Sequence, residues 1–157
     1  MSEFGITVLE ILERLLASLV AGALIGWDRE RKSKPAGLRT HMLVTLGSAT
    51  FCVMAFEVGA ALSERYGERG VDPMRVLDGV VGGIGFLGAG SIIQARGRVQ
   101  GITTAAGVWM AGALGAACGV GAYKLAALSA VLAFLVLTVL AKVERHLPRN
   151  EPEPQPD

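Results

Sequence analysis

The sequence predicts an all-α membrane protein, a polytopic bundle of five transmembrane helices that pack through glycine. Hydrophobic residues make up 52% of the 157 residues and charged residues only 18%. Four stretches contain no Asp, Glu, Lys or Arg, namely 40–56, 79–95, 99–123 and 125–141. A soluble domain of this size would expose large apolar patches if it held four such stretches. Apolar segments of about 17–25 residues are long enough to cross the hydrocarbon core of a bilayer.

Five spans follow from this pattern, and we place them at residues 6–27, 40–62, 74–95, 102–120 and 123–143. In lipid each segment has to satisfy its own backbone hydrogen bonds, which favours helices over strands. No segment alternates apolar and polar residues over the length of a barrel strand. Asp72 followed by Pro73 is typical of a helix start, and Arg96-Gly97-Arg98 predicts a tight turn before the fourth span.

The five spans form one domain, residues 1–147, and a tail of alternating proline and acid follows at 148–157. The composition of the tail is typical of disorder. The N-terminus has no basic region before the apolar stretch at 15–27, so we expect this stretch to stay as a helix instead of being cleaved. Glu10 and Arg14 have the four-residue spacing of an ion pair at the start of the first span.

Basic residues near the span ends predict the orientation. With the N-terminus outside, ten lie on the cytoplasmic side and four on the opposite side. The ten are Arg29, Arg31, Lys32, Lys34, Arg39, Arg96, Arg98, Lys142, Arg145 and Arg149, and the four are Arg65, Arg69, Arg75 and Lys124. Because cytoplasmic loops carry an excess of Lys and Arg, we expect an outside N-terminus and a cytoplasmic C-terminus.

Several function classes lack support in the sequence. The net charge of +1 gives no sign of nucleic-acid binding. Cys52 and Cys118 lie in apolar segments, where small core residues are the simplest interpretation. There is no Cys/His cluster for a transition metal, and no nucleophile–base pair, so we expect neither a cofactor nor an enzyme.

Glycine accounts for 21 of the 157 residues, nearly twice the ordinary share of about 7%. Many glycines repeat at four-residue steps, which keep small residues on one face of a helix. In lipid such faces let helix backbones approach closely. We expect helix packing within the chain, with a pore or a homodimer contact as the alternatives, at Gly22, Gly26, Gly79, Gly83, Gly85, Gly88, Gly90, Gly115 and Gly119.

Charged residues that flank the first loop are candidates for a functional site. Asp28, Arg29 and Glu30 follow the first span, where they either set the topology as an interfacial cluster or form a structured mouth in which Asp28 or Glu30 pairs with Arg39. Arg39 stands at a helix start, where the helix dipole disfavours a cation. We therefore expect a partner or an anionic ligand there, such as a lipid phosphate or a nucleotide. Thr40 can cap the second span.

The remaining candidates lie deeper in the spans. Glu57 is the one acid far into the second span, where it either has a function or reaches the outer interface. Asp78 can pair with Arg75 or act near the helix start. Thr103 and Thr104 can line a polar path or cap the fourth span. Because Mg²⁺ prefers several oxygen ligands, this set supports a magnesium path only weakly and leaves the metal-binding residues undefined.

Three blocks carry a family resemblance: GALIGWDRE at 22–30 with AGLRT at 36–40, GIGFLGAG at 83–90, and GITTAA at 101–106 with GVGAY at 119–123. In this order and separated by spans, they resemble the MgtC/SapB (YhiD-like) family of bacterial inner-membrane proteins over residues 6–143. The glycines at 83–88 mimic a dinucleotide fingerprint, but they sit in an uncharged membrane segment instead of a strand–helix turn.

The resemblance implies a five-span domain that is linked to growth and magnesium homeostasis at low magnesium. Some members aid survival inside host cells and are thought to restrain the membrane ATP synthase. We therefore expect a non-enzymatic, self-associating inner-membrane protein that modulates ion balance or a membrane partner such as ATP synthase. The alternatives are a transporter or channel for magnesium or another ion, and a lipid-binding membrane protein.

The sequence departs from the family pattern at three points. We expect a short form that lacks the soluble C-terminal domain of longer members. Asp28 keeps the acid where members commonly have Glu, and Trp27 replaces an apolar residue there. Asp78-Gly79 stands where members commonly have Ala-Gln. This chain therefore has no glutamine side-chain amide at that position, which questions any role of that amide here.

Overall fold

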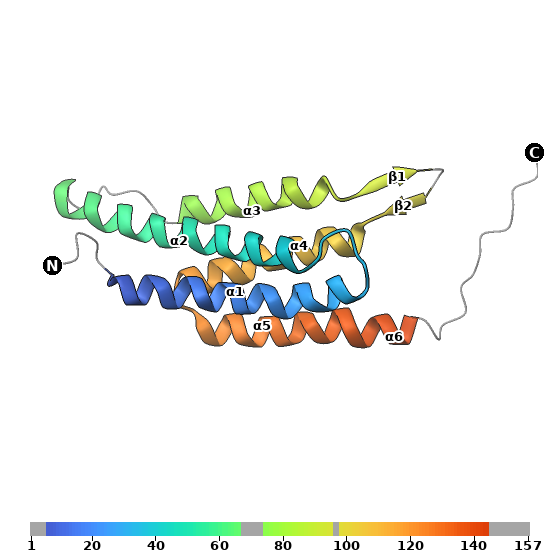
Figure 1. The fold of residues 1–157 in the computed structure, drawn as a ribbon. Coiled ribbons are helices and arrows are strands. Elements are labelled where there is room, and N and C mark those ends of the chain that lie inside the picture. Colours follow the sequence, from blue (N-terminus) through green and yellow to red (C-terminus); the bar gives the residue numbers. More distant parts are fainter. Residues whose placement is uncertain (1–5, 67–73, 96–97, 145–157) are drawn as a thin grey trace, which may run out of the picture.

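Five long helices run back and forth along one direction, so that α1 begins at one end of the bundle and the last helix finishes at the other (Figure 1). The computed structural model describes residues 6–66, 74–95 and 98–144. The long helices are α1 Val8–Arg31, α2 Leu38–Tyr66, α3 Met74–Ala89, α4 Ile102–Gly119 and α5 Tyr123–Leu135. A π-helical turn, η1 Val136–Leu140, and the short helix α6 Ala141–Glu144 continue α5.

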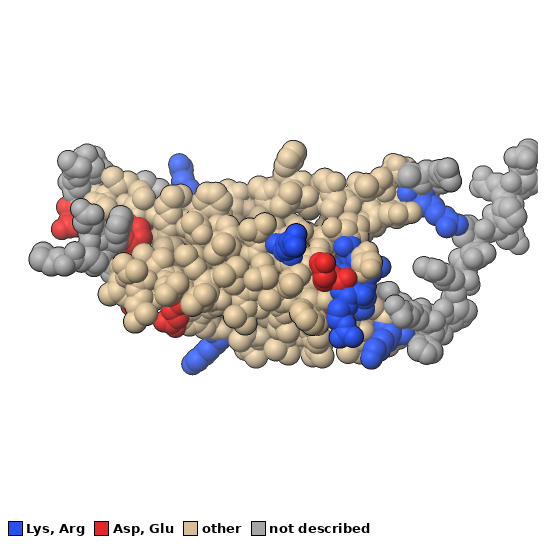
Figure 2. All heavy atoms as spheres, in the orientation of Figure 1, with Lys and Arg blue, Asp and Glu red and all other residues tan. Residues whose placement is uncertain are grey.

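This architecture confirms the predicted helical membrane bundle. Within the described ranges, three segments are long and apolar enough to cross a bilayer by themselves: Leu38–Glu64, Ile102–Gly119 and Tyr123–Val143. Large apolar side chains also cover the outside of the bundle, and on the face in Figure 2 the charged side chains lie mostly towards its two ends. A surface of this kind is stable when lipid covers it.

The third span differs from the prediction, because its helix ends at Ala89 and a hairpin follows. Strand β1, Ile93–Ala95, pairs with β2, Arg98–Gln100, in antiparallel register with Ile93 opposite Gln100. The Ser91 hydroxyl donates to the Gly88 carbonyl at 2.6 Å, and the Ser91 N–H donates to the same carbonyl at 2.9 Å. These bonds satisfy the last turn of α3 and release the chain into the hairpin.

Helix α4 is the centre of the bundle, since it packs against α1, α2, α3 and α5. Glycine makes this possible. A Cβ atom on Gly115 would collide with the Thr45 carbonyl of α2, and one on Gly119 would lie 2.6 Å from the Ala49 carbonyl. These two α4 glycines therefore lie in direct contact with the backbone of α2.

Helix α1 also contacts α2 through glycines, on another side of α2. A Cβ atom on Gly22 would collide with the Thr45 hydroxyl, and one on Gly26 would lie 2.8 Å from the Leu38 Cα atom. Gly88 brings α3 to α4, because its Cβ atom would lie 3.2 Å from the Ala105 carbonyl. The predicted packing role thus fits the geometry at Gly22, Gly26, Gly88, Gly115 and Gly119.

Within the described residues, the other predicted glycines of α3 do not pack against another helix. A Cβ atom on Gly79, Gly83 or Gly85 would meet nothing within 4 Å among the described residues. Gly90 lies beyond the helix end and faces only the Phe86 and Leu87 carbonyls of its own helix. The expectation of intramolecular packing is therefore wrong at these four positions, because α3 reaches the bundle along a different face.

Both cysteines are buried and free, as small core residues would be. Three of the sequence expectations concern residues outside the described ranges, namely the Asp72-Pro73 helix start, the centre of the Arg96–Arg98 turn and the tail at 148–157.

The glycine contacts predict which small substitutions the bundle tolerates. Gly115→Ala places a methyl group against a rigid backbone carbonyl, so we expect a loss of about 1–3 kcal/mol and a lower Tm of the detergent-solubilised protein. Gly47→Ala is the matched control, because its Cβ atom would meet nothing within 4 Å and alanine favours the helix. Equal Tm values for the two variants would contradict the proposed contact.

Candidate functional site

The acids after the first span hold the end of α1 to its neighbours. Glu30 Oε2 accepts a hydrogen bond from the Leu38 N–H at 2.9 Å, so Glu30 caps the start of α2. Asp28 forms an ion pair with Lys32 at 2.7 Å. Lys32 Nζ also donates to the Leu137 carbonyl of η1 at 3.2 Å. Together these contacts fix the end of α1 against both α2 and η1.

Two predicted roles in this loop are wrong. Helix α2 begins at Leu38, so Thr40 lies inside its first turn and does not cap it. Arg39 is exposed, and within the described ranges it forms no ion pair with Asp28 or Glu30. Both carboxylates bind nearer groups, Asp28 the Lys32 ammonium and Glu30 a backbone N–H, so neither needs Arg39.

Arg29 is the charged residue that the fold buries. Its side chain leaves α1 and is only 4% exposed. Nη2 donates to the Thr104 hydroxyl of α4 at 2.7 Å, while Nε has no hydrogen-bond partner among the described residues. Burial lowers the pKa of the Arg29 guanidinium, and the nearby Asp28 carboxylate opposes this shift. Arginine still keeps its charge in proteins, so a cation is held here.

His41 lies close to this position on α2 and is fully buried. Its Nδ1 atom lies 2.8 Å from the Gly37 carbonyl, and its Nε2 atom has no partner in the described part of the chain. Nε2 lies 3.2 Å from where a Cβ atom on Gly107 would be. Gly107 thus makes room for the imidazole between α2 and α4.

A cleft of about 1370 Å³ opens beside Arg29 at this end of the bundle. Figure 2 shows the opening between the hairpin and the last helix. Arg29, Lys32 and Lys34 contribute cations to its lining, and residues 101–104 contribute the start of α4. The opposite wall is apolar and consists mainly of Val136, Leu137 and Leu140. The cleft is larger than ordinary ligand pockets of about 300–1,000 Å³.

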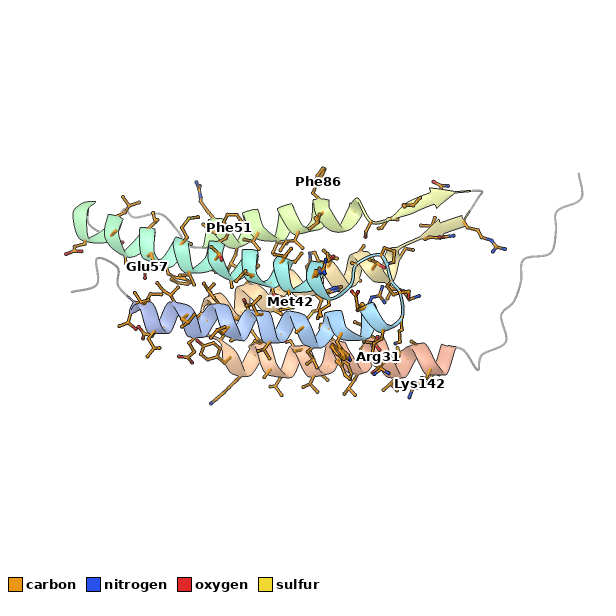
Figure 3. All side chains as sticks on the ribbon, in the orientation of Figure 1. Arg31, Met42, Phe51, Glu57, Phe86 and Lys142 are labelled. Carbon is orange, nitrogen blue, oxygen red and sulfur yellow. The ribbon has the colours of Figure 1, made fainter. Side chains whose placement is uncertain are left out.

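Other polar contacts hold the opposite end together. Glu57 is 8% exposed and points from α2 toward the start of α1 (Figure 3), where its Oε1 atom accepts from the Ile6 N–H at 3.2 Å. Arg14 donates to the Gly119 carbonyl at 2.9 Å. The predicted Glu10–Arg14 ion pair is wrong, because Glu10 instead forms a capping box with Thr7.

Asp78 and Arg75 also lie toward this end, on the exposed surface of α3. The two side chains form no ion pair with each other, and no hydrogen bond of either is present within the described ranges. The predicted pairing is therefore absent inside the chain. A charged pair left open on a membrane helix is costly unless something else satisfies it.

The fold thus divides the predicted site residues into two groups. Asp28, Arg29 and Glu30 lie at one end of the bundle, where Thr103 and Thr104 begin α4, while Glu57 and Asp78 lie toward the other. In the described ranges, no group of three or more His, Cys, Asp or Glu side chains is arranged to hold a metal ion.

The sequence analysis used Lys32 and Lys34 only for orientation and did not identify them, or His41, as residues of the site. The four-residue step from Asp28 to Lys32 on one helix was a usable signal for the ion pair. No local pattern distinguished Arg29 as buried or placed His41 between two helices, because both positions depend on helix packing.

The fold and its buried cation define a helical membrane protein with a polar site at one end of the bundle. The chain belongs to the MgtC family, whose model matches residues 15–146. It is 39% identical over 130 residues to the "Putative magnesium transporter YhiD" of Escherichia coli (strain K12), covering 83% of this chain and 60% of that protein.

Two further relatives show similar agreement. Identity is 37% over 141 residues to "Protein SrpB" of Synechococcus elongatus, covering 84% of this chain and 75% of that protein. It is 37% over 128 residues to "Protein MgtC" of Salmonella typhimurium, covering 82% of this chain and 51% of that protein. The chain therefore spans about half to three quarters of the length of these relatives. No solved structure is significantly similar to the chain.

The Arg29–Thr104 contact predicts a specific sensitivity. Thr104→Val keeps the shape of the side chain but removes the acceptor of a buried guanidinium, so we expect a loss of about 1–3 kcal/mol and a lower Tm in detergent. Thr50→Val is the control, since the Thr50 hydroxyl is exposed and bonds only to the Leu46 carbonyl of its own helix. If Thr104→Val and Thr50→Val have the same Tm, the Arg29–Thr104 contact does not stabilise the bundle.

Proposed function

We propose that the protein is a non-enzymatic inner-membrane component of magnesium homeostasis, which acts as a homo-oligomer on ion balance or on a membrane partner. The name of the Escherichia coli relative refers to magnesium transport, and the family resemblance links such proteins to low magnesium. The membrane ATP synthase is one candidate partner. The observation that carries the regulatory role is the tight, internally bonded centre of the bundle.

Hydroxyl groups within the spans are bound to backbone carbonyls. Ser18 donates to Leu15 at 2.7 Å, and Ser48 of α2 donates across to Gly112 of α4 at 2.7 Å. Thr45 donates to Met42 at 2.9 Å. The Ser18 and Thr45 bonds stay within their own helices, whereas the Ser48 bond and the glycine contacts join α2 to α4, and glycine contacts also join α1 to α2. This close packing supports a packed scaffold over an ion path between these helices.

The distribution of charge supports the proposed orientation. On the face in Figure 2, Lys and Arg gather at the end where α1 finishes. Arg29, Lys32, Lys34 and Arg39 belong to α1, α2 and the loop between them. Basic residues favour the cytoplasmic side, so this end faces the cytoplasm and the start of α1 faces outward.

Self-association is supported by the open surface of α3. Arg75, Gly79, Gly82 and Phe86 recur at steps of three and four residues, which places them on one helix face. Phe86 is 85% exposed and points away from the bundle (Figure 3). Small residues on such a face allow two helix backbones to approach closely in lipid.

Arg75 and Asp78 of α3, which have no partner among the described residues, favour a second copy of this chain as the occupant of that surface. About a two-fold axis along the membrane normal, equal positions of two α3 helices lie at equal depth. Asp78 of one protomer then meets Arg75 of its partner, and the pair forms twice. This arrangement satisfies both charges, for which the described part of the chain offers no partner.

A flux measurement tests the regulatory role. Liposomes that contain only this protein should take up Mg²⁺ no faster than protein-free liposomes, because close glycine contacts join α1 and α4 to α2. A Mg²⁺ dye enclosed in the liposomes provides the readout, with an ionophore as positive control. Robust uptake that saturates with Mg²⁺ would replace the proposal with the transporter alternative.

A charge exchange tests the oligomer. Asp78→Arg places like charges at the α3 contact, so we expect the dimer fraction, measured by crosslinking in membranes, to fall at least about tenfold, which corresponds to about 1.4 kcal/mol. The double variant Arg75→Asp/Asp78→Arg restores opposite charges and should recover the dimer. Unchanged crosslinking in Asp78→Arg, or no recovery in the double variant, would refute the reciprocal pair.

A further inference from the structure

The cleft beside Arg29 combines features that bind a negative charge. Its lining contains Arg29, Lys32 and Lys34 but no acid among the described residues. The Asp28 carboxylate, which acts on Arg29, is already engaged by Lys32 at 2.7 Å. Among the described residues, the lining of the cleft therefore carries more positive than negative charge.

The start of α4 adds donors to this lining. Its N-cap residue is Gly101, and no side chain caps the helix. The N–H groups of the first turn, Ile102, Thr103 and Thr104, have no intrahelical partner, and the helix dipole makes this end positive. Helix N-termini of this kind bind phosphate and other anions.

Gly101 also shapes the backbone at this point. Its φ angle of +91° is in the left-handed region, and a Cβ atom there would collide with the Ser91 carbonyl. Glycine thus lets β2 turn directly into α4 beside the last turn of α3. The first turn of α4 consequently lines the cleft instead of being covered by a capping side chain.

Arg29 is independent evidence for a ligand at this helix end. The side chain is 4% exposed, lines the cleft, and has a buried Nε–H with no partner among the described residues. Its Nη2 is anchored to the Thr104 hydroxyl at 2.7 Å, which holds the guanidinium against the first turn of α4. A buried and incompletely bonded guanidinium is costly, and an anion with several oxygens would relieve that cost.

The other wall of the cleft suits hydrocarbon. Val136 and Leu140 are exposed on the outside of the last helix, and Leu137 is half-buried between them. Lys32 connects the two walls, because its Nζ atom also binds the Leu137 carbonyl. A charged head at the α1–α4 end and an apolar chain along η1 can therefore be held at the same time.

We infer that this cleft binds the phosphate group of a net-anionic ligand, a phospholipid head group or a soluble phosphate ester. The guanidinium of Arg29, the ammonium of Lys34 and the first-turn N–H groups of α4 receive the phosphate oxygens. This site goes beyond the proposed magnesium role and does not depend on it. It also differs from the predicted anion site at Arg39, which does not line the cleft.

Binding to the full chain in a neutral detergent tests the site with defined probes. Dihexanoyl phosphatidylglycerol and glycerol 3-phosphate are anionic, and dihexanoyl phosphatidylcholine is the matched lipid without net charge. We expect phosphatidylglycerol to raise the Tm and to appear in native mass spectra as one bound lipid, while phosphatidylcholine does neither. If glycerol 3-phosphate raises the Tm and binds as strongly as phosphatidylglycerol does, the ligand of this site is a soluble phosphate ester.

Variants then locate the binding. Lys34→Gln and Arg29→Gln should each weaken Kd about tenfold, the loss of one charge-assisted contact worth about 1.4 kcal/mol. Lys34 is exposed, so its variant folds even if the Arg29 variant does not. Arg31→Gln is the matched control. Arg31 ends α1, the helix that carries Arg29, and its side chain is exposed and does not line the cleft.

Two results would overturn the inference. One is equal binding of phosphatidylglycerol and phosphatidylcholine with no response to glycerol 3-phosphate. The other is a loss of affinity in Arg31→Gln as large as that in Lys34→Gln, because net charge alone would then explain the binding.

Discussion

Direct contact between helix backbones is the constraint on which this bundle depends. Thr45 of α2 lies at the centre of it, with its hydroxyl against Gly22 of α1 and its carbonyl against Gly115 of α4. Hydrophobic burial does not drive helices together in lipid, so close approach has to supply dispersion and short polar contacts instead. A methyl group at either glycine would separate the helices that carry the polar end.

The polar end is a consequence of that approach. Because α1 and α4 are both held against α2, Arg29 of α1 can reach Thr104 of α4 at 2.7 Å. The same geometry encloses His41 and leaves the first turn of α4 uncapped beside three cations. The protein thus maintains buried positive charge at one membrane interface, where it is costly unless a counter-charge is available.

Helix α3 shows that the same residue type serves two purposes in one protein. Its final glycine in the helix, Gly88, packs against α4, whereas Cβ atoms on Gly79, Gly83 and Gly85 would meet no described residue within 4 Å. The open face also carries Arg75 and Asp78 without partners in the described part of the chain. A surface that is both smooth and charged suits protein contact better than contact with acyl chains.

Composition and spacing determined the class of fold. A soluble domain of this size would expose uncharged runs of this length to water, so the runs indicate helices that cross a membrane. Composition and spacing also determined which residues are small enough for close packing and which charges flank the first span. They could not show which glycines pack, since a four-residue step looks the same on a buried face and on an open one. Only the tertiary structure decided that Arg29 is buried while Arg39 is exposed, and that Thr104 meets the guanidinium 75 residues away. The reason is physical: burial and pairing depend on which helix lies beside each residue, and that arrangement is set by the sum of contacts in the bundle, not by any local pattern.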